Sequence, residues 1–519
     1  MTDILPSYLR DAWWTPASAT GATDVRDAST GEVVTRVSTD GIDLAGAIVH
    51  ARTIGQASLG ALTFHQRALL LKEFGIALTA RKEELYELSK RAGATVRDSL
   101  SDVDGGIGVL FTYSSKGRRE LPNAQVYLDG PVEPLSKDGS FLGRHVYTRL
   151  PGVAVQINAF NFPMWGALEK FAPAFLAGVP TIVKPATPTA YVAEAWVRIL
   201  VETGKLPAGS LQLVSGAVSG LFDHLGLGDL VGFTGSASTA SRLREQAAPG
   251  VRFTSETDSI NASVLGPDAV PGTPEFDAYV KQLMVELTTK AGQKCTAIRR
   301  AIVPQGAVDP LVSALRDKIA ERVVVGDPHA DAVTMGPLVS LAQRDEVLRA
   351  VGELEAAGGR ILLGTTDAPD VTLADGSTGP APDGAFLTPI VIGFDGAADA
   401  LPDAVHDVEA FGPVASVLAY RTVDEAAELV GRGGGSLVTS VATSDPSVAA
   451  TFLARTAAYN GRLLFLDRDD ARTSTGHGAP VPHLVHGGPG RAGGGEGLGG
   501  IRAVLHHMQR TAGPGAPAV

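Results

Sequence analysis

A regular alternation of short apolar runs with helix-length amphipathic stretches, beginning at Val153, constrains the fold of this chain more than any other feature. Apolar runs bounded by Gly, Pro and Asn are typical of buried strands, and apolar residues at every third or fourth position are typical of helices. Strands are expected at 153–157, 181–184, 211–214 and 230–234, with helices at 165–176, 190–203 and from 236 onward. This order predicts βαβ units, a parallel sheet, and ligands at the carboxyl ends of its strands.

A second alternating series runs from about residue 261 to 442. Because a chain of 519 residues exceeds what one hydrophobic core usually holds, more than one domain is expected. Helices are expected within 44–58 and 64–92, whereas Pro and Gly punctuate 121–150, which ends in an alternating, strand-like stretch. The predicted fold class is α/β, with two parallel-sheet domains and a small β excursion from the main body.

The tail of the chain, from Asp469, is rich in glycine and is expected to consist mostly of loops. Within it, 501–510 suits either a helix or a strand, and 512–519 is expected to be mobile. The segment 495–500 matches G-x-G-x-x-G, but no strand precedes it, so we do not interpret it as a dinucleotide fingerprint.

The charge balance limits the partners of this chain. Its net charge is −12, with 44% hydrophobic and 19% charged residues. These values favour a globular protein and argue against nonspecific binding to nucleic acid or anionic membranes, although a local basic pocket for a phosphorylated ligand stays compatible with them. We expect neither an export signal nor a membrane span, and therefore a cytoplasmic location.

Cys295 is the only cysteine, so it is either an inert core residue or a nucleophile. The preceding stretch, 286–291, is expected to end a helix, with Glu286 and Lys290 paired four residues apart and Gly292 breaking the helix. Cys295 would then lie on a turn beside Lys294, at a possible helix start. The positive charge of Lys294 and the N-terminus of that helix would each lower the pKa of the Cys295 thiol.

Three loops at the ends of predicted strands carry candidate ligand-binding groups. Asn161, in Asn158-Ala-Phe-Asn-Phe-Pro163, is either a helix cap or an amide donor for an oxyanion. Lys184 is either a solvated loop lysine or a nucleotide contact. Gly235 and Ser236 begin a helix whose free N-terminus could hold a phosphate, the alternative being an ordinary cap.

Glu256 is a candidate general base because apolar residues flank it, with Asp258 as its rival and a surface carboxylate pair as the alternative. Three histidines, His477, His483 and His486, have spacing that could suit a metal. No cysteine or acidic residue lies near them in the sequence, so no metal site is predicted.

Taken together, these motifs resemble the aldehyde dehydrogenase superfamily over nearly the whole chain. They are Asn161-Phe-Pro, Lys184-Pro-Ala, Phe233-Thr-Gly-Ser, Glu256, Gly292-Gln-Lys-Cys295 and Glu409-Ala-Phe-Gly-Pro-Val414, in the order found in the family. The stretches 158–163, 288–300 and 486–496 are most similar to the subgroup that contains the aldehyde dehydrogenase part of PaaZ, a phenylacetate-degradation protein.

The resemblance implies a role for each of these residues. Cys295 would be the nucleophile, Glu256 the base and Asn161 an oxyanion donor. The cofactor would be held by Phe160, Lys184, Thr187, Gly235, Ser236, Glu409 and Phe411. Many NAD-preferring relatives carry a glutamate where this chain has Thr187, and the loss of a carboxylate removes repulsion against a 2′-phosphate. NADP is therefore the expected cofactor, with NAD as the alternative.

The resemblance also implies a domain layout. Residues 1–124 and 151–260 would form the dinucleotide-binding domain and 261–480 the catalytic domain. Residues 125–150 and 481–519 would form an oligomerisation element and tail, so a homo-oligomer, at least a dimer, is expected.

The implied activity is NADP-dependent oxidation of a CoA-linked semialdehyde to the carboxylate. The first candidate substrate is 3-oxo-5,6-dehydrosuberyl-CoA semialdehyde, and the alternative is 3,4-dehydroadipyl-CoA semialdehyde of benzoyl-CoA degradation. PaaZ carries a hydratase domain of the MaoC type, so a separate enoyl-CoA hydratase would supply the aldehyde here. Two other possibilities are a CoA-acylating dehydrogenase and a catalytically silent nucleotide-binding scaffold.

Overall fold

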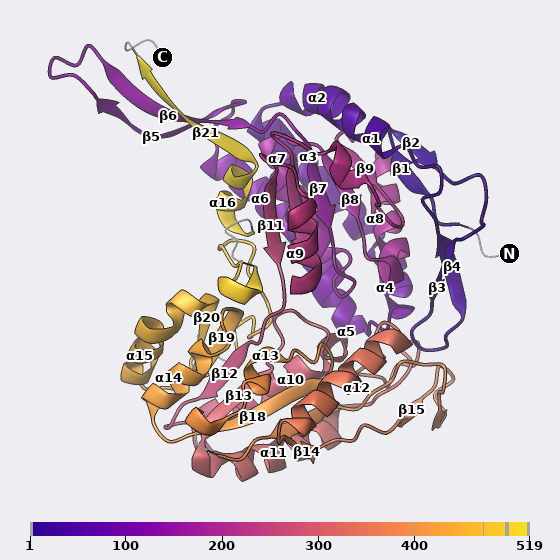
Figure 1. The fold of residues 1–519 in the computed structure, drawn as a ribbon, viewed down its shortest axis with the longest axis vertical. Helices are drawn as coiled ribbons and strands as arrows, with labels where there is room; N and C mark the ends of the chain where they lie inside the picture. The colour runs from indigo at the N-terminus through magenta and orange to yellow at the C-terminus, as the bar shows by residue number, and fades with distance from the viewer. Residues whose placement is uncertain (1–3, 397, 471, 494–497, 516–519) are drawn as a thin grey trace.

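The computed structural model describes residues 4–396, 398–470, 472–493 and 498–515. Two seven-stranded sheets form the centres of its upper and lower halves (Figure 1). The upper sheet has the order β11-β10-β7-β8-β9-β1-β2, and its first five strands run parallel. Its strands are β1 (Ser7–Leu9), β2 (Ala12–Trp14), β7 (Ala154–Ile157), β8 (Thr181–Lys184), β9 (Leu211–Leu213), β10 (Leu230–Thr234) and β11 (Arg252–Glu256). The strands expected from the sequence are confirmed.

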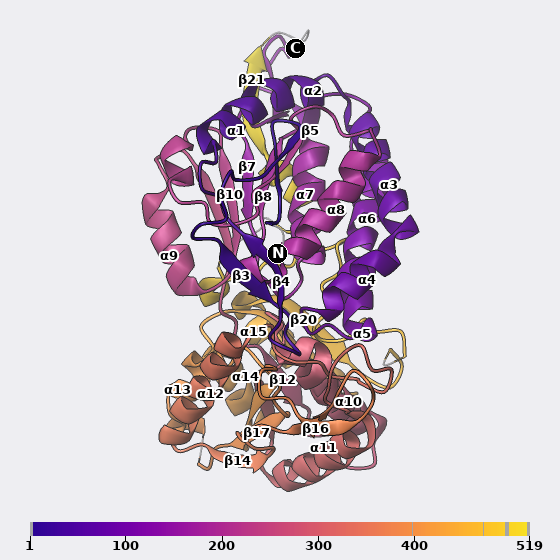
Figure 2. The ribbon, with the colours of Figure 1, turned by 90° about the vertical axis from the view of Figure 1, so that its right-hand side faces the viewer.

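Helices cover both faces of the upper sheet, with α1 and α9 on one side and α3, α6, α7 and α8 on the other (Figure 2). Large side chains such as Phe171, Phe175 and Trp196 are fully buried beneath them, and each contributes roughly 2–3 kcal/mol of hydrophobic stabilisation. The helices are α1 (Leu44–His50), α2 (Gln56–Gly60), α3 (Phe64–Ala80), α4 (Lys82–Lys90), α5 (Val96–Ser99), α6 (Gly105–Glu120), α7 (Trp165–Ala177), α8 (Ala190–Glu202) and α9 (Ala237–Gln246). Short π-helical turns, Ala51–Gly55 and Leu100–Asp104, join α1 to α2 and α5 to α6.

The lower sheet has the order β14-β17-β18-β13-β12-β19-β20 and is parallel except for β14. Two separate hydrophobic clusters are built around it, as a sheet buried on both faces requires. Its strands are β12 (Ala262–Leu265), β13 (Arg300–Pro304), β14 (Arg360–Leu363), β17 (Ile390–Gly393), β18 (Val414–Tyr420), β19 (Ser436–Ala442) and β20 (Asn460–Leu466). Its helices are α10 (Pro274–Thr288), α11 (Val308–Arg322), α12 (Leu341–Ala356), α13 (Ala404–Asp407), α14 (Val423–Gly431) and α15 (Pro446–Thr456).

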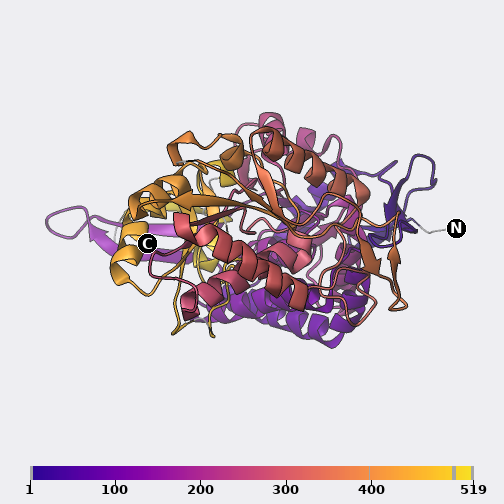
Figure 3. The ribbon, with the colours of Figure 1, turned by 90° about the horizontal axis from the view of Figure 1, so that it is seen from below.

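A three-stranded antiparallel arm projects from the upper half, away from the end where the N-terminus lies (Figures 1 and 3). It consists of β5 (Tyr127–Pro134), β6 (Leu142–Arg149) and β21 (Met508–Gly515), which follows α16 (Gly500–His506). The predicted β excursion is thus confirmed, and 501–510 proves to be partly helix and partly strand. The expectation of mobility is wrong for 512–515, because these residues pair with β6 from Ala512↔His145 to Gly515↔Leu142. Residues 516–519 lie outside the described part of the chain.

Two small hairpins, β3–β4 (Thr23–Arg26 and Val33–Val37) and β15–β16 (Asp370–Thr372 and Thr378–Pro380), complete the fold. None of the helices in the described ranges is long and apolar enough to cross a membrane.

Candidate active site

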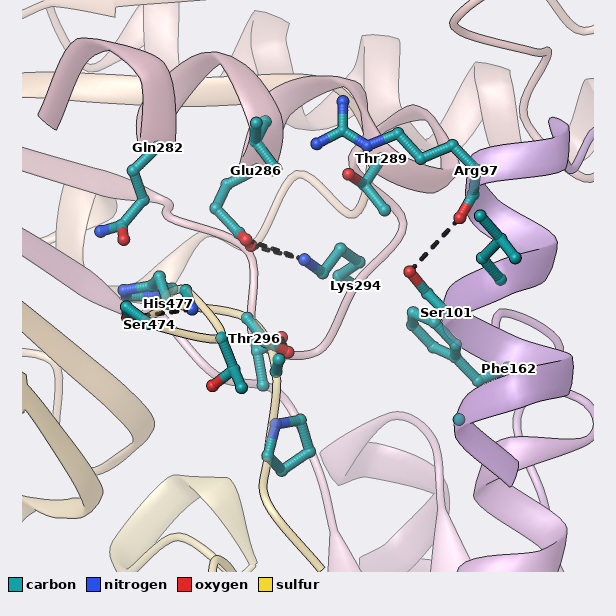
Figure 4. A pocket seen from close by; sticks show the side chains of 18 of the residues that line it. Arg97, Ser101, Phe162, Gln282, Glu286, Thr289, Lys294, Thr296, Ser474 and His477 are labelled. Carbon is teal, nitrogen blue, oxygen red and sulfur yellow. Dashed lines mark hydrogen bonds and ion pairs between the residues drawn. The ribbon is translucent and has the colours of Figure 1, made fainter. Parts of the chain in front are cut away.

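Cys295 lies on the connection between a 3-10 turn (Thr289–Gly292) and β13, and its side chain is half-buried. It lines a cavity of 460 Å³ between the two halves of the molecule. Figure 4 shows side chains of this cavity arriving from α10 and the Cys295 loop on one side and from Phe162 on the other. The cavity gives an incoming ligand access to the only thiol of the chain.

The turn before Cys295 depends on a close backbone approach. Gly292 has φ +68°, and a Cβ there would lie 2.1 Å from the carbonyl oxygen of Gly412. The buried Arg299 guanidinium donates to the Gly292 oxygen at 2.9 Å and to the Gly412 oxygen at 2.7 Å. The Asn261 amide donates to the Cys295 oxygen at 2.8 Å. These buried bonds fix the backbone that carries the sulfur.

The helix before this turn ends earlier than the sequence suggested. Helix α10 stops at Thr288, and Lys290 and Ala291 adopt left-handed φ values of 53° and 51°. The backbone N–H of Lys290 donates to the Asp98 carboxylate at 2.8 Å, and its side-chain ammonium lies 3.7 Å from the carboxylate of Asp102. The expected pair of Glu286 with Lys290 is therefore wrong.

Glu286 pairs instead with Lys294, at 2.8 Å from the ammonium to each carboxylate oxygen. Both side chains are almost fully buried, with exposed fractions of 4% and 7%. Figure 4 shows this pair reaching across the cavity wall. The partner engages the charge of Lys294, so little of it acts on the neighbouring thiol.

The thiol environment contradicts the expectation of a lowered pKa. The pKa of the Cys295 thiol is raised to about 12. Burial is the largest cause, the carboxylates of Glu256, Glu169 and Glu409 add to it, and Lys294 lowers the pKa by less. The residues that follow Cys295 form a turn that leads into β13, not a helix, so no helix N-terminus favours the thiolate. In this state the thiol is protonated at neutral pH.

Two candidate oxyanion donors, the Asn161 side-chain amide and the Cys295 backbone N–H, have no hydrogen-bond partner among the described residues. Asn161 is buried in the loop that joins β7 to α7, next to Phe162, which lines the Cys295 cavity. Both groups can therefore donate to an oxygen that carries developing negative charge.

Glu256 is the last residue of β11, and its carboxylate is near enough to Cys295 to raise the pKa of the thiol. Its carboxylate is 3.4 Å from the Lys170 ammonium and accepts from the Thr234 hydroxyl at 3.3 Å. Its rival, Asp258, accepts instead from the backbone N–H of Ala237 at 3.0 Å. Asp258 is thus engaged at a helix end, and Asp258 is not among the carboxylates that raise the pKa of Cys295, whereas Glu256 is.

The same contact corrects the expectation of a free helix N-terminus at α9. Ser236 caps α9 and accepts from the Thr239 N–H at 3.3 Å, and Asp258 occupies the Ala237 N–H. The backbone N–H of Gly235 donates to the backbone carbonyl oxygen of Glu256 at 3.1 Å. A Cβ on Gly235 would lie 2.6 Å from the Phe233 ring. A phosphate here would compete with these internal bonds.

A second cavity, of 580 Å³, opens at the carboxyl ends of β7, β8 and β10. Lys184 and Phe233 line it, together with Arg242 of α9. The Lys184 ammonium has no carboxylate partner among the described residues, and burial lowers its pKa. The lining also contains one carboxylate, that of Asp223. A buried lysine without an ion-pair partner at this edge of a parallel sheet makes the cavity a candidate site for the phosphates and ribose of a dinucleotide.

Glu409, Phe160 and Phe411 come together from the two halves of the molecule. The Phe160 and Phe411 rings meet edge-to-face with centroids 5.9 Å apart. Burial raises the pKa of Glu409 to about 7, and its Oε1 atom has no hydrogen-bond partner among the described residues. Arg299 Nε lies 3.7 Å away, beyond hydrogen-bond reach. A buried acceptor without a donor fits a ribose hydroxyl.

Thr187 begins a short 3-10 turn (Thr187–Thr189) after β8, and it is not one of the residues that line the Lys184 cavity. His477 and His486, two of the histidines considered for a metal, have different partners. The ring of His477 bonds to Ser440 at 2.8 Å, and His486 pairs with Glu169 at 2.6 Å. The described residues contain no group of three or more side chains suited to a metal ion.

Sequence reasoning missed Lys170, Glu169 and Trp165. All three lie on α7, and they contact Glu256, pair with His486 and line the Cys295 cavity, respectively. The sequence pattern indicated this helix only through its apolar residues. A lysine and a glutamate adjacent in a helix that is otherwise buried were the available signal.

The fold and the site define an α/β oxidoreductase with a cysteine facing a substrate cavity and a separate nucleotide-sized cavity. The model described as "Aldehyde dehydrogenase family" matches residues 14–462. A 3,4-dehydroadipyl-CoA semialdehyde dehydrogenase from Aromatoleum evansii is 42% identical over 489 residues, which cover 93% of each chain. Protein MaoC from Klebsiella aerogenes is 44% identical over 185 residues, 36% of this chain and 51% of that protein.

Solved structures agree on the fold. A lactaldehyde dehydrogenase superposes with a TM-score of 0.83 at 21% identity, covering 99% of both chains. Betaine aldehyde dehydrogenase from Staphylococcus aureus, in complex with NAD⁺, gives a TM-score of 0.84 at 22% identity, covering 99% and 95%. The chain belongs to the aldehyde dehydrogenase family and is an NAD(P)-dependent enzyme with the aldehyde dehydrogenase fold.

Proposed function

We propose that this enzyme oxidises a CoA-linked semialdehyde to the corresponding carboxylate. The observation that carries the proposal is the 42% identity to a 3,4-dehydroadipyl-CoA semialdehyde dehydrogenase, which extends over 93% of both chains. That compound is therefore the first candidate substrate, ahead of 3-oxo-5,6-dehydrosuberyl-CoA semialdehyde. The second candidate retains support from the motifs at 158–163 and 288–300, which resemble the PaaZ subgroup.

Cys295 is proposed as the nucleophile. The thiol first loses its proton to solvent. The thiolate sulfur then bonds to the aldehyde carbon, and the carbonyl electron pair moves onto oxygen. The Asn161 amide and the Cys295 N–H, both without partners among the described residues, donate to that oxyanion. The product of this step is a thiohemiacetal on Cys295.

The cofactor supplies the chemistry of oxidation, because NAD(P) accepts the hydride that the thiohemiacetal carbon loses when it becomes a thioester. Lys184 would hold the phosphates or ribose, and Glu409 Oε1 would accept from the nicotinamide ribose. Phe160 and Phe411 would line the channel that holds the cofactor, and Gly235 and Ser236 would lie beside the diphosphate of the cofactor. We propose NADP over NAD because Thr187 places no carboxylate against a 2′-phosphate.

Glu256 is proposed as the base that releases the product. It takes a proton from water, the hydroxide adds to the thioester carbon, and the C–S bond breaks to return the Cys295 thiolate. Lys170, 3.4 Å from the Glu256 carboxylate, holds this side chain near the cavity. A CoA-acylating enzyme would not need this base, and a silent scaffold would need neither Cys295 nor Glu256.

We assign residues 1–124 and 151–260 to a dinucleotide-binding domain, 261–480 to a catalytic domain, and 125–150 with 481–519 to oligomerisation. The arm leaves Leu128, Leu135 and Phe141 exposed by 46%, 52% and 46%, which supports a homo-oligomer, at least a dimer. We propose a cytoplasmic location and a separate enoyl-CoA hydratase that forms the substrate.

The experiment is a side-by-side assay of the two CoA semialdehydes, each with NADP and with NAD, following reduced cofactor by absorbance. The proposal predicts the highest kcat/KM for 3,4-dehydroadipyl-CoA semialdehyde with NADP. A higher value for the dehydrosuberyl compound would select the second substrate. Equal rates for both CoA compounds and for their short aldehyde analogues would overturn CoA-linked specificity.

A further inference from the structure

A third cavity, of 720 Å³, lies next to the one that contains Cys295. The two cavities share Arg97, Leu100 and Lys281, so they are adjacent where α5 and the turn that follows it face α10. Figure 4 places Arg97 at the edge of the Cys295 cavity, beside Thr289. A ligand too long for the inner cavity would leave it along this route.

The outer cavity is strongly basic, although the chain has a net charge of −12. Its cationic side chains outnumber its one acidic residue, Asp331. They are Lys90, Arg97, Lys281, Lys318 and Arg322. Such a concentration of positive charge favours an anionic ligand of several charges.

Most of this charge is not neutralised inside the protein. Lys90 pairs with Glu87 at 2.7 Å and Arg322 with Glu321 at 2.9 Å. Within the described part of the chain, Arg97, Lys281 and Lys318 have no carboxylate partner. Three cations from two different halves of the molecule therefore converge on one cavity without counter-ions.

Apolar side chains accompany these cations where the cavities join. Val96 and Leu100 are exposed by 55% and 50%, which is high for side chains of this size on a folded surface. Leu100 lines both cavities, and Met284 lines the outer one. An apolar strip between the basic cavity and Cys295 fits a flexible, mostly uncharged chain.

We propose that the outer cavity binds the 3′-phosphorylated ADP portion of coenzyme A, while the pantetheine arm passes Leu100 and carries the aldehyde to Cys295. The three phosphate groups meet the unpaired cations of Arg97, Lys281 and Lys318. This inference rests on the proposed CoA-linked function and names the surface responsible for it.

The outer basic cavity, proposed here as the CoA surface, is distinct from the cavity assigned to the cofactor. The Lys184 cavity is lined by residues of the upper sheet and α9, and it shares no lining residue with the outer basic cavity. Two adenine nucleotides can therefore occupy the enzyme together, as the reaction of a CoA-linked substrate with NAD(P) requires.

The test compares Lys281→Glu, Lys318→Glu and the double variant with the wild type, and Lys72→Glu is the matched control. Lys72 is exposed on α3 and lines none of these cavities. The ratio of kcat/KM for 3,4-dehydroadipyl-CoA semialdehyde to kcat/KM for a short aliphatic aldehyde is measured. Each single reversal should lower the ratio on the order of tenfold, and the double variant on the order of 100-fold.

The outcomes separate this inference from the function beneath it. A wild-type enzyme without preference for the CoA compound contradicts the proposed function. A strong wild-type preference that the double variant and Lys72→Glu both retain overturns the CoA surface alone. Circular dichroism and activity on the short aldehyde establish that the variants are folded.

Binding provides a second measurement. Acetyl-CoA, titrated calorimetrically into enzyme saturated with NADPH, should bind the wild type and Lys72→Glu, and it should bind the double variant on the order of 100-fold more weakly. Acetyl-dephospho-CoA, which lacks the 3′-phosphate, should lose affinity for the wild type. Equal affinity of both compounds for the wild type and the double variant would overturn the inference.

Discussion

The two sites of the enzyme differ in how they treat charge. Around Cys295, burial and, after it, nearby carboxylates together raise the pKa of the thiol to about 12, and the ammonium of Lys294 is engaged by Glu286. In the cavity at the end of β8, the opposite holds, since the Lys184 ammonium is buried without a carboxylate partner among the described residues. The Cys295 site thus disfavours the thiolate that the proposed attack needs, whereas the Lys184 cavity, which we propose for the cofactor, presents a cation without an ion-pair partner.

This difference teaches that nucleophilicity cannot be inferred from sequence neighbours alone. Lys294 is adjacent to Cys295 in the chain, yet its charge is directed to a buried partner 2.8 Å away. The reactive thiolate must therefore form only when a ligand changes the balance of charge in the cavity.

The largest expected effect is the loss of dehydrogenase turnover when Cys295 is replaced. Cys295→Ala removes the sulfur that carries both covalent intermediates, so dehydrogenase turnover should fall by about 10⁴-fold or more. Reduced-cofactor absorbance measures it, and Cys295→Ser shows whether an oxygen nucleophile can substitute. Substantial turnover in Cys295→Ala would contradict the assignment.

The next effect concerns Glu256. Because Glu256→Gln cannot accept a proton from water, steady-state turnover should fall about 10²- to 10⁴-fold, while the first hydride transfer persists as a burst. Stopped-flow absorbance resolves the two phases. Asp258→Asn is the matched control, since Asp258 is bonded to the Ala237 N–H and should leave the burst and steady rate in their original proportion.

The nucleotide side of the comparison is sharpened by Lys184→Met, which keeps the length of the side chain and removes its charge. The Kd for NADP should rise about 10- to 100-fold, because a charge-assisted contact contributes roughly 1.5–3 kcal/mol. Calorimetric titration measures it, with Lys72→Met as the exposed control. An unchanged Kd would show that the Lys184 cavity does not hold the cofactor.

The smallest effect is a pH dependence of thiol alkylation. Since the raised pKa leaves the thiol protonated, the rate of Cys295 alkylation by iodoacetamide should increase about tenfold per pH unit from pH 7 to 9 without a plateau. Glu256→Gln removes a carboxylate that raises this pKa and should increase the rate at pH 8. A plateau below pH 8 would indicate an activated thiolate at rest.

The sequence predicted the parts of the site that depend on local order. The strand ends at Lys184 and Thr234 and the cysteine turn follow from short-range patterns of glycine, proline and apolar residues, whereas at Ser236 the sequence left a cap and a free helix N-terminus as alternatives, and the structure shows the cap. The family resemblance assigned both Phe160 and Phe411 to the cofactor, but the contact between their rings was not predicted, because 251 positions separate the two residues (411 − 160 = 251).

What the sequence could not give were contacts between distant charges. The helix end at Thr288 is decided by Asp98, which accepts the Lys290 N–H, and the Ala237 N–H is taken by Asp258. Short-range patterns contain no information on which carboxylate reaches which donor across a folded core. For the same reason, the pKa of Cys295 was predicted in the wrong direction.

The most direct test of the central claim is the mass of the trapped intermediate. Glu256→Gln is mixed with an aldehyde and NADP, quenched in acid, and examined by intact-protein and peptide mass spectrometry. The account predicts a mass increase on Cys295 equal to the mass of the aldehyde less two hydrogens, and none in the double variant Glu256→Gln/Cys295→Ala. A burst of NADPH without any adduct, or an adduct on another residue, would contradict it.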